Sequence, residues 1–289
     1  MVGFKFADAT LNGSALVNVR IEKGELVAEQ GGNTLHGTAL AGAHLFAQVR
    51  NINAIPQTSA TVEYKLDAIA TELPAWDPLA TGNTYIYTLK QWVPDTSSWG
   101  FACPADADGN KVAIPLTATW DESGARVTSS TLFTFGCTTG VIAKCYRWGY
   151  RPWVTGYGDL VTAHQTCTRM ARADYCGTGR SYTSDGTEIN AWDNLPSPGP
   201  IMHHTTAPTG MTFEAGWDTG GAVCFSHSRW LLNGTLVGVL CPTRLVAPVL
   251  VLGVLLGGTV CDVEADVLNY GSGIRLYDDS NLNLDLDLF

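Results

Sequence analysis

Three residues in the middle of the chain carry side chains that together could perform nucleophilic catalysis. His164 stands three positions before Cys167, and Asp174 follows later in the same predicted helical stretch. Residues three apart share a helix face, so the imidazole could convert the thiol into a thiolate nucleophile while Asp174 orients the ring, as in a Cys/His hydrolase. The interpretation we favour is a buried structural pair, because Cys167 lies among cysteines expected to form disulfides and a disulfide sulfur is no such nucleophile.

Two charged side chains close to these residues allow both a structural and a ligand-binding interpretation. Arg169 precedes Asp174 by five positions, and a buried Arg–Asp pair would fix the helix on a sheet through bidentate hydrogen bonds. We favour this structural role. The alternative is that Arg169 recognises a carboxylate of a ligand.

Oxygen ligands for a metal ion gather in one acidic loop. The loop that contains Gly186 carries three carboxylates within nine residues, those of Asp185, Glu188 and Asp193. Hard oxygen ligands on a glycine-containing loop can bind calcium. The spacing does not match an EF-hand, so we favour a turn capped by Asp185. The sequence therefore predicts no cofactor, with calcium at Asp185 and Asp193 as the alternative.

Tryptophans are the third group of candidate binding residues. Trp148, Trp153 and Trp192 belong to a chain with 9 tryptophans, and aromatic rings of this kind can form a face that binds a sugar or a peptide. The alternative is a hydrophobic core that uses tryptophan. The G-x-S-x-G, G-x-G-x-x-G and P-loop motifs are absent from the sequence.

Cysteine usage indicates an oxidising compartment. The chain has eight cysteines: Cys103, Cys137, Cys145, Cys167, Cys176, Cys224, Cys241 and Cys261. None forms a C-x-x-C pair, and the even number favours an extracytoplasmic protein stabilised by disulfides. Short loops are easiest to close, which favours Cys137–Cys145 and Cys167–Cys176. The alternative is a set of buried free thiols in a cytoplasmic protein.

Composition limits the class of protein. The 289 residues carry a net charge of −10, with 45% hydrophobic and 15% charged residues. These values exclude a disordered chain or a coiled coil, and the negative charge argues against nucleic acid as a partner.

The signals for export and for membrane insertion are weak. The start of the sequence shows no signal peptide, so the chain is either cytoplasmic or begins after a removed leader. An uncharged stretch at 245–261 contains Pro248, Gly253 and Gly257 and is too short for a spanning helix. We therefore expect buried strands there and no membrane insertion.

The distribution of apolar residues predicts a mainly β protein. Within residues 1–50, large apolar residues such as leucine recur every five positions. This spacing fits either a pentapeptide-type coil or short strands in which Val17 and Val19 point inward. Alternation predicts antiparallel strands over 58–120, in a sandwich or a barrel.

The second half of the chain predicts two short helices between strands. The first helix covers 140–151 and is stopped by Pro152, and the second covers 163–176, with Cys167, Met170 and Asp174 on one stripe. Asn233-Gly234 predicts a hairpin, and the strict alternation of Leu282–Leu288 predicts a terminal strand that could pair with a second copy.

We therefore expect an α+β protein that is mainly β, with pentapeptide-like N-terminal strands, an antiparallel sandwich or barrel, two short central helices and stabilising disulfides. The predicted segments are 1–50, repeat-like; 51–130, antiparallel β; 131–245, cysteine-rich; and 246–289, C-terminal strands. The last three segments are expected to form one compact unit.

The central sequence is similar to a known family. The stretches FTFGCTTGVIAKCYRWGYRPW (133–153) and AHQTCTRMARADYCGTGRSYTSDGTEINAWD (163–193) resemble the ADYC-domain proteins, a bacterial family common in myxobacteria, whose motif stands here as Ala173-Asp174-Tyr175-Cys176. The resemblance covers roughly residues 10–245. It implies an exported, disulfide-bonded protein and no particular reaction.

The function that we predict is that of an exported or cell-surface, non-enzymatic binding or structural protein. Its partner is expected to be a protein, a peptide or a glycan. The first alternative is the hydrolase that uses His164, Cys167 and Asp174. The second is a peptide-binding accessory protein of natural-product biosynthesis, with an aromatic groove.

Overall fold

The computed structural model describes residues 2–51, 58–72, 84–196, 198–229, 241, 249–251, 254–256 and 260–281. The chain divides into two compact units. The barrel unit consists of Met1–Asp121 and Arg126–Arg147, and the C-terminal unit consists of Glu122–Ala125 and Trp148–Phe289.

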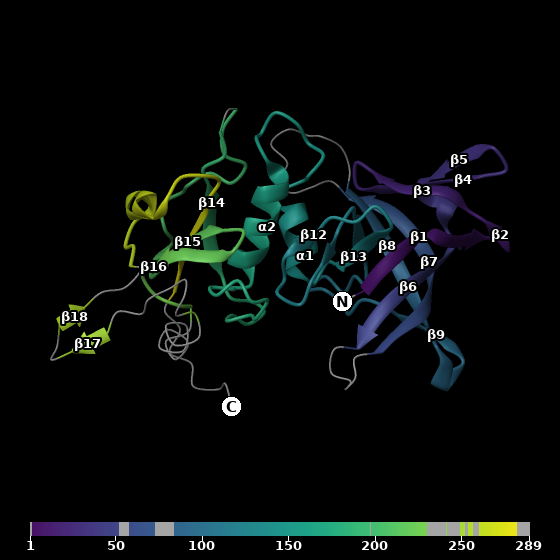
Figure 1. Ribbon diagram of the computed structural model, residues 1–289, viewed down its shortest axis with the longest axis horizontal. Coiled ribbons are helices and arrows are strands. Elements are labelled where there is room, and N and C mark those ends of the chain that lie inside the picture. Colours follow the sequence, from purple (N-terminus) through teal and green to yellow (C-terminus); the bar gives the residue numbers. More distant parts are fainter. Residues whose placement is uncertain are drawn as a thin grey trace. The chain divides into compact units, whose positions relative to one another are not determined.

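Six antiparallel strands of the barrel unit close on themselves (Figure 1). They are, in order around the barrel, β10 (Ala113–Leu116), β13 (Leu132–Cys137), β1 (Val2–Leu11), β6 (His44–Asn51), β7 (Thr58–Glu72) and β8 (Thr84–Val93). The pairing of Ala113 with Tyr87 joins β10 to β8 and completes the circle. Closure removes exposed sheet edges, and the predicted mainly β fold with a barrel is confirmed.

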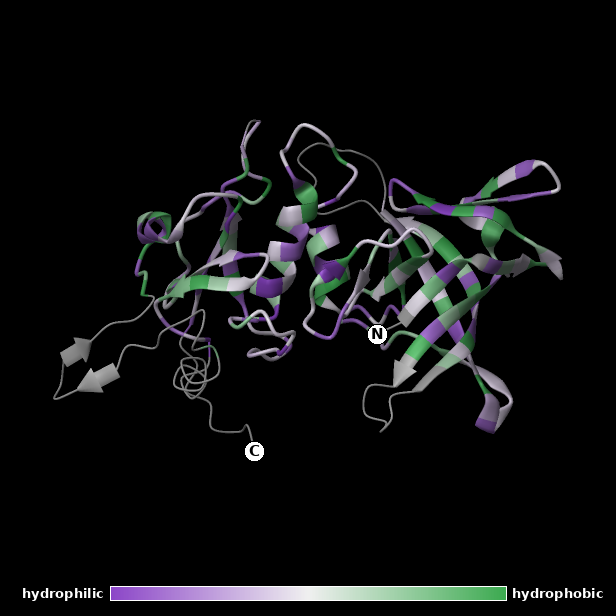
Figure 2. Cartoon of the chain, viewed as in Figure 1, coloured by the Kyte–Doolittle hydropathy of each residue, from purple (hydrophilic) through white to green (hydrophobic). Residues whose placement is uncertain are grey.

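The barrel interior is a packed core. Strand residues alternate between apolar and polar along β6, β7 and β8, as the coloured bands in Figure 2 show. Phe4 lies on this core with its ring edge against Tyr64 at 4.8 Å and against Phe135 at 5.0 Å between ring centroids. The hydroxyl of Tyr87 accepts a hydrogen bond from the Leu26 amide at 2.9 Å, which ties a neighbouring hairpin to the barrel.

The five-residue rhythm at the N-terminus comes from short strands and glycine turns. A three-stranded antiparallel sheet consists of β3 (Val17–Glu22), β4 (Glu25–Gln30) and β5 (Asn33–His36), followed by the 3₁₀ helix η1 (Gly37–Leu40). The strand alternative is therefore confirmed and the pentapeptide coil is wrong. Val17 is 53% exposed, contrary to the prediction, because a bulge with Asn18 at φ 49° interrupts the alternation, whereas Val19 is buried.

Small elements complete the barrel unit. β2 (Ser14–Ala15) pairs with β1, and β9 (Ser98–Phe101) pairs with the C-terminal part of β8. β11 (Thr119–Trp120) and β12 (Arg126–Val127) form a two-stranded ribbon. The first predicted helix is α1 (Val141–Arg147). It ends before Pro152, because Gly149 already has φ 101° and turns the chain away.

One helix and one sheet organise the C-terminal unit. The helix α2 (Leu160–Ala171) begins at Asp159, whose carboxylate accepts hydrogen bonds from the amides of Val161 and Thr162. It packs against an antiparallel sheet with the order β14 (Ile189–Asp193), β19 (Leu276–Ser280), β15 (Thr212–Asp218) and β16 (Gly221–Phe225). A short helix α4 (Glu264–Val267) and a 3₁₀ helix η3 (Leu268–Tyr270) precede β19.

The uncharged stretch at 245–261 contains two short strands, which confirms the predicted strands, whereas their predicted burial stays a prediction. β17 (Val249–Val251) and β18 (Val254–Leu256) pair with each other in antiparallel orientation. Within the described ranges, no helix has the length and apolar character that crossing a bilayer requires. The hairpin predicted at Asn233-Gly234 and the strand predicted at Leu282–Leu288 lie outside the described residues.

All eight cysteines are oxidised, which confirms the predicted disulfide stabilisation and contradicts the free-thiol alternative. The pairs are Cys103–Cys137 in the barrel unit and Cys176–Cys241 and Cys224–Cys261 in the C-terminal unit, and Cys145 and Cys167 are each disulfide-bonded as well. The pairings predicted from short loops, Cys137–Cys145 and Cys167–Cys176, are wrong. Loop-closure entropy favours them only in the unfolded chain, whereas the fold brings distant segments together.

Candidate functional site

The Ala-Asp-Tyr-Cys motif forms the turn that follows helix α2. The amide of Ala173 donates to the Met170 carbonyl at 2.9 Å, and the amide of Asp174 donates to the Arg169 carbonyl at 2.9 Å. Ala173 has φ 51°, a left-handed conformation that ends the helix, and its small side chain is fully buried. Asp174 therefore lies beyond the helix, and the predicted stripe that placed it on the face of Cys167 is wrong.

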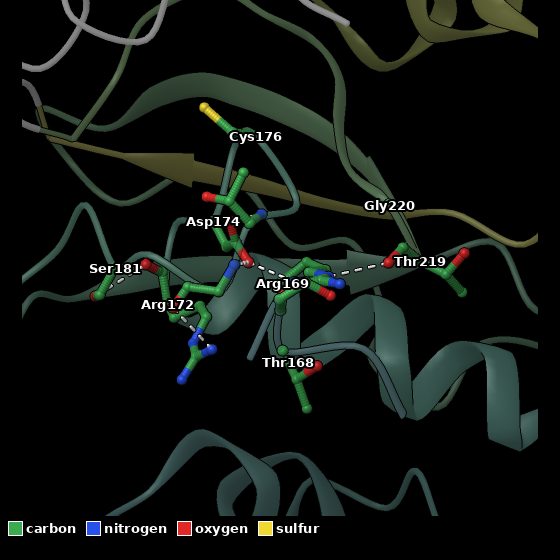
Figure 3. Close-up of polar contacts among 12 residues, drawn as sticks. Thr168, Arg169, Arg172, Asp174, Cys176, Ser181, Thr219 and Gly220 are labelled. Carbon is green, nitrogen blue, oxygen red and sulfur yellow. Dashed lines mark hydrogen bonds and ion pairs between the residues drawn. The ribbon is translucent and has the colours of Figure 1, made fainter. Parts of the chain in front are cut away.

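Asp174 holds this turn together from a position with no solvent exposure. One carboxylate oxygen, Oδ1, accepts the Thr178 amide at 3.0 Å, and the other, Oδ2, accepts the Gly179 amide at 2.8 Å. Oδ2 also accepts Nη1 of Arg169 at 2.5 Å (Figure 3). The carboxylate thus fixes the loop after the motif and neutralises a buried cation.

Arg169 distributes its donors over three acceptors. Besides the bond to Asp174, its Nε donates to the Thr219 carbonyl at 3.0 Å (Figure 3). Its Nη1 also donates to the Ser123 carbonyl at 2.5 Å. The structure therefore brings the predicted Arg–Asp pair together, but by one nitrogen and not by a two-bond fork. Its side chain is 3% exposed, so a ligand carboxylate would have to displace these protein contacts.

Tyr175 is the buried aromatic centre of the C-terminal unit. Its ring centroid lies 5.0 Å from that of Trp217 and 5.9 Å from that of Phe225. Its hydroxyl donates to Glu214 Oε1 at 2.7 Å and accepts the Arg229 amide at 3.0 Å. Burial, followed by the charge of Glu214, raises the pKa of this phenol well above its ordinary value, so Tyr175 stays neutral.

A second buried ion-pair network adjoins Tyr175, and no sequence pattern pointed to it. Arg229 donates from Nε to Glu214 at 2.8 Å and from Nη2 to Asp278 at 2.7 Å, and Trp217 Nε1 donates to Asp278 at 2.7 Å. Glu214 and Asp278 are completely buried and Arg229 is 1% exposed. The three charged members, Glu214, Arg229 and Asp278, come from separate segments of the sequence, so neither spacing nor periodicity relates them.

Two carboxylates share one guanidinium in this network. Burial raises the pKa of Asp278 well above its ordinary value, and the negative charge of Glu214 raises it further. Burial lowers the pKa of Arg229, but the two carboxylates outweigh this effect and the net shift is upward. The arrangement therefore keeps Arg229 charged and makes Asp278 harder to deprotonate than an exposed carboxyl group.

Cys176 and two glycines attach the motif to the sheet. Cys176 is bonded to Cys241, and the amide of Ala222 donates to the Tyr175 carbonyl at 3.1 Å. A Cβ on Gly177 would lie 1.8 Å from the Gly220 carbonyl oxygen, and Gly177 has φ 67°. The loop thus contacts the β15–β16 turn backbone to backbone, which a side chain would prevent.

The residues of the predicted nucleophilic site are placed as follows. His164 and Cys167 both lie on α2 with no solvent exposure. Cys167 is disulfide-bonded, so its sulfur is not a thiolate. Asp174 is engaged by Arg169 and by the two amides of the following loop.

The three candidate tryptophans differ in their environments. Trp192 is 2% exposed and lies in the core, with its Nε1 donating to Glu264 at 3.0 Å. The exposed His204 stacks on its ring at 4.1 Å. Trp148 and Trp153 are partly buried. Trp192 therefore does not stand on an open face.

The two candidate calcium ligands also differ. Asp193 accepts the hydroxyl of Tyr150 at 2.9 Å and the amides of Leu195, Ile201 and Met202. Burial raises its pKa, an effect that these hydrogen bonds partly offset. Asp185 is exposed. Among the described residues, no group of three or more His, Cys, Asp and Glu side chains is arranged to hold a metal ion.

Comparison with known proteins identifies one match. The family model of the ADYC domain matches residues 37–231, which include the motif and the residues that surround it. No curated protein and no solved structure matches the chain.

Proposed function

We propose, from the premise that this chain belongs to the ADYC-domain family, that it acts outside the cytoplasm as a non-enzymatic binding or structural module. In this proposal the motif is a structural hub of the fold, and recognition takes place elsewhere on the surface. The disulfides support the location, because disulfides form and persist in oxidising compartments.

The observation that carries the proposal is the engagement of the reactive groups of the motif. Asp174 is occupied by Arg169 and two backbone amides, Tyr175 by Glu214 and the Arg229 amide, and Cys176 by a disulfide. A catalytic acid, base or nucleophile needs access to a substrate, whereas Asp174 and Tyr175 have no solvent exposure. These contacts suit a hub that orders α2 and the sheet.

A count of free thiols tests the proposal. The purified protein is denatured without reductant, treated with iodoacetamide, digested and analysed by mass spectrometry, and a reduced sample serves as the control. We expect no alkylated cysteine before reduction and all eight afterwards. Stoichiometric alkylation of Cys167 without reduction would contradict the proposal and would favour the hydrolase that uses His164.

A further inference from the structure

Four side chains lie in register across four adjacent strands on the outer face of the barrel. His44 of β6 pairs with Lys65 of β7, Lys65 pairs with Lys90 of β8, and Lys90 pairs with Phe101 of β9. Directly opposed residues point to the same side of a sheet. Leu66, the next residue after Lys65, is buried in the barrel core, so the row of four faces outward.

Positive charge is concentrated at this row. Lys65 and Lys90 are directly opposed, an arrangement that costs stability for like charges. Asp67 stands at a bulge in β7 and contacts both ammonium groups, Lys90 at 2.9 Å and Lys65 at 3.8 Å. Lys111 adds a third ammonium, so three of the six lysines of a chain with net charge −10 gather here.

Acidic side chains lie at the row as well. The second carboxylate that contacts it is that of Glu63, whose Oε1 lies 2.6 Å from His44 Nδ1. Three lysines and the two carboxylates of Asp67 and Glu63 thus lie together at the row. Bulges of the kind that holds Asp67 occur frequently beside functional sites.

Aromatic rings lie among these cations. Trp92 is directly opposed to Trp99, with their rings edge to face at 5.4 Å, and the ring of Trp99 meets that of His44 at 5.5 Å. Phe101 is 52% exposed, and the ammonium groups of Lys90 and Lys111 lie 5.4 Å and 4.5 Å from its centroid. We call this surface the aromatic–lysine strip. It consists of His44, Lys65, Lys90, Trp92, Trp99, Phe101 and Lys111.

We propose that the aromatic–lysine strip binds an acidic polysaccharide. Its sugar rings pack on the aromatic side chains through their apolar faces, and its carboxylates meet the lysine ammonium groups. This inference rests on the proposed binding function and names the class of ligand and the surface that takes it.

Location decides between this ligand and a single-stranded nucleic acid, which uses the same combination of stacking and cations. The net charge of −10 opposes both polyanions alike, so binding depends on the lysines of the strip. The disulfides support a location outside the cytoplasm, in which acidic polysaccharides are met.

Native gel electrophoresis through immobilised polymer tests the ligand class. The probes are polygalacturonate, its fully methyl-esterified form, which has the same backbone without the charge, and oligothymidylate. We expect polygalacturonate to retard the protein at low ionic strength, with weaker retardation in added salt. We expect the ester and oligothymidylate to retard it less.

Substitutions at two positions of the strip, the exposed Phe101 and the half-buried Lys111, test the surface. Phe101→Ser and Lys111→Gln should each raise the dissociation constant for polygalacturonate about fivefold, because each removes one stacking or charge contact. The matched controls are Leu268→Ser, at a position 69% exposed in the C-terminal unit, and Lys144→Gln, at an exposed position on α1. The controls should bind as the unmodified protein does, and thermal melting checks that all four variants fold.

Several outcomes would overturn the inference. They are no retardation by polygalacturonate, equal retardation by the ester, stronger retardation by oligothymidylate, or equal loss of binding in the control variants. The thiol count is independent of these measurements. Failure of the gel assay with all cysteines oxidised would therefore remove the ligand class and leave the proposed function standing.

Discussion

Replacing Asp174 with asparagine tests the role of the motif as a structural hub. The carboxylate accepts three hydrogen bonds, from Thr178 to Oδ1 and from Gly179 and Arg169 to Oδ2. An asparagine of the same size keeps one oxygen and replaces the other with an NH₂ group, which cannot accept. At least one donor therefore loses its acceptor, and Arg169 loses its buried counter-charge.

The expected change in the free energy of unfolding follows from these two losses. An unsatisfied buried donor costs about 1–3 kcal/mol, and breaking a buried ion pair by removing one charge costs about 3–5 kcal/mol. The two terms share the contact with Arg169, so they do not add in full. We expect Asp174→Asn to lower the free energy of unfolding of the C-terminal unit by about 3–5 kcal/mol.

Urea denaturation with intact disulfides, followed by tryptophan fluorescence, measures this change. The midpoint should fall while the slope m stays the same, since the surface exposed on unfolding is unchanged. Asp185→Asn is the matched control, because it makes the same chemical change at an exposed position. A loss below about 1 kcal/mol for Asp174→Asn would refute the reasoning, because surface substitutions already reach nearly that value. A double variant that removes both charges, Arg169→Met with Asp174→Leu, should lose less than the sum of the single losses.

Three further predictions follow from the same unit. Folding raises the pKa of Asp278 above its ordinary 3.8. The contribution of this group to the free energy of unfolding is therefore complete below about pH 4 and is lost as the pH rises through the raised pKa. Asp278→Asn should therefore flatten the decline of the urea midpoint as the pH rises above about 4, and an unchanged slope would contradict this assignment. Replacing Cys176 and Cys241 together with serine opens a loop with a sequence separation of 65 and should cost about 4 kcal/mol, measured by the same denaturation; a loss near zero would argue against a stabilising role. Gly177→Ala should prevent accumulation of folded protein, whereas Gly186→Ala, with a positive φ but nothing within 4 Å, should cost only about 1–2 kcal/mol; equal behaviour of the two would refute the steric argument.

Local patterns in the sequence predicted the type of most elements, and tertiary contacts decided their limits. Alternation along β7 and β8 sufficed for strands because each has one buried face. Closure of the barrel depends on β1 lying between β13 and β6, a long-range pairing that no local pattern contains. Helix α2 was expected to continue to Cys176, but Ala173 adopts a left-handed conformation in which the packing of a small buried side chain outweighs its helix propensity.

In the candidate site, too, contacts between residues close in sequence could be predicted, whereas contacts made by the fold could not. The Arg169–Asp174 contact could be predicted because five residues around a helix end bring two side chains together. The network of Glu214, Arg229 and Asp278 could not, since its members meet only through the order of strands in the sheet. The disulfides were foreseen in number and not in pairing, because the number follows from composition and the pairing from the completed fold.

The strands β1 and β19 determine which fragments of this protein contain complete sheets. The family model covers residues 37–231, yet β1 (Val2–Leu11) and β19 (Leu276–Ser280) lie outside that range and occupy interior positions in their sheets. A recombinant fragment restricted to the matched range would have an open barrel, a sheet without its second strand and an Arg229 without the carboxylate of Asp278. The boundaries of sequence similarity are therefore not those of the folding units, and fragments for expression need to include both flanks.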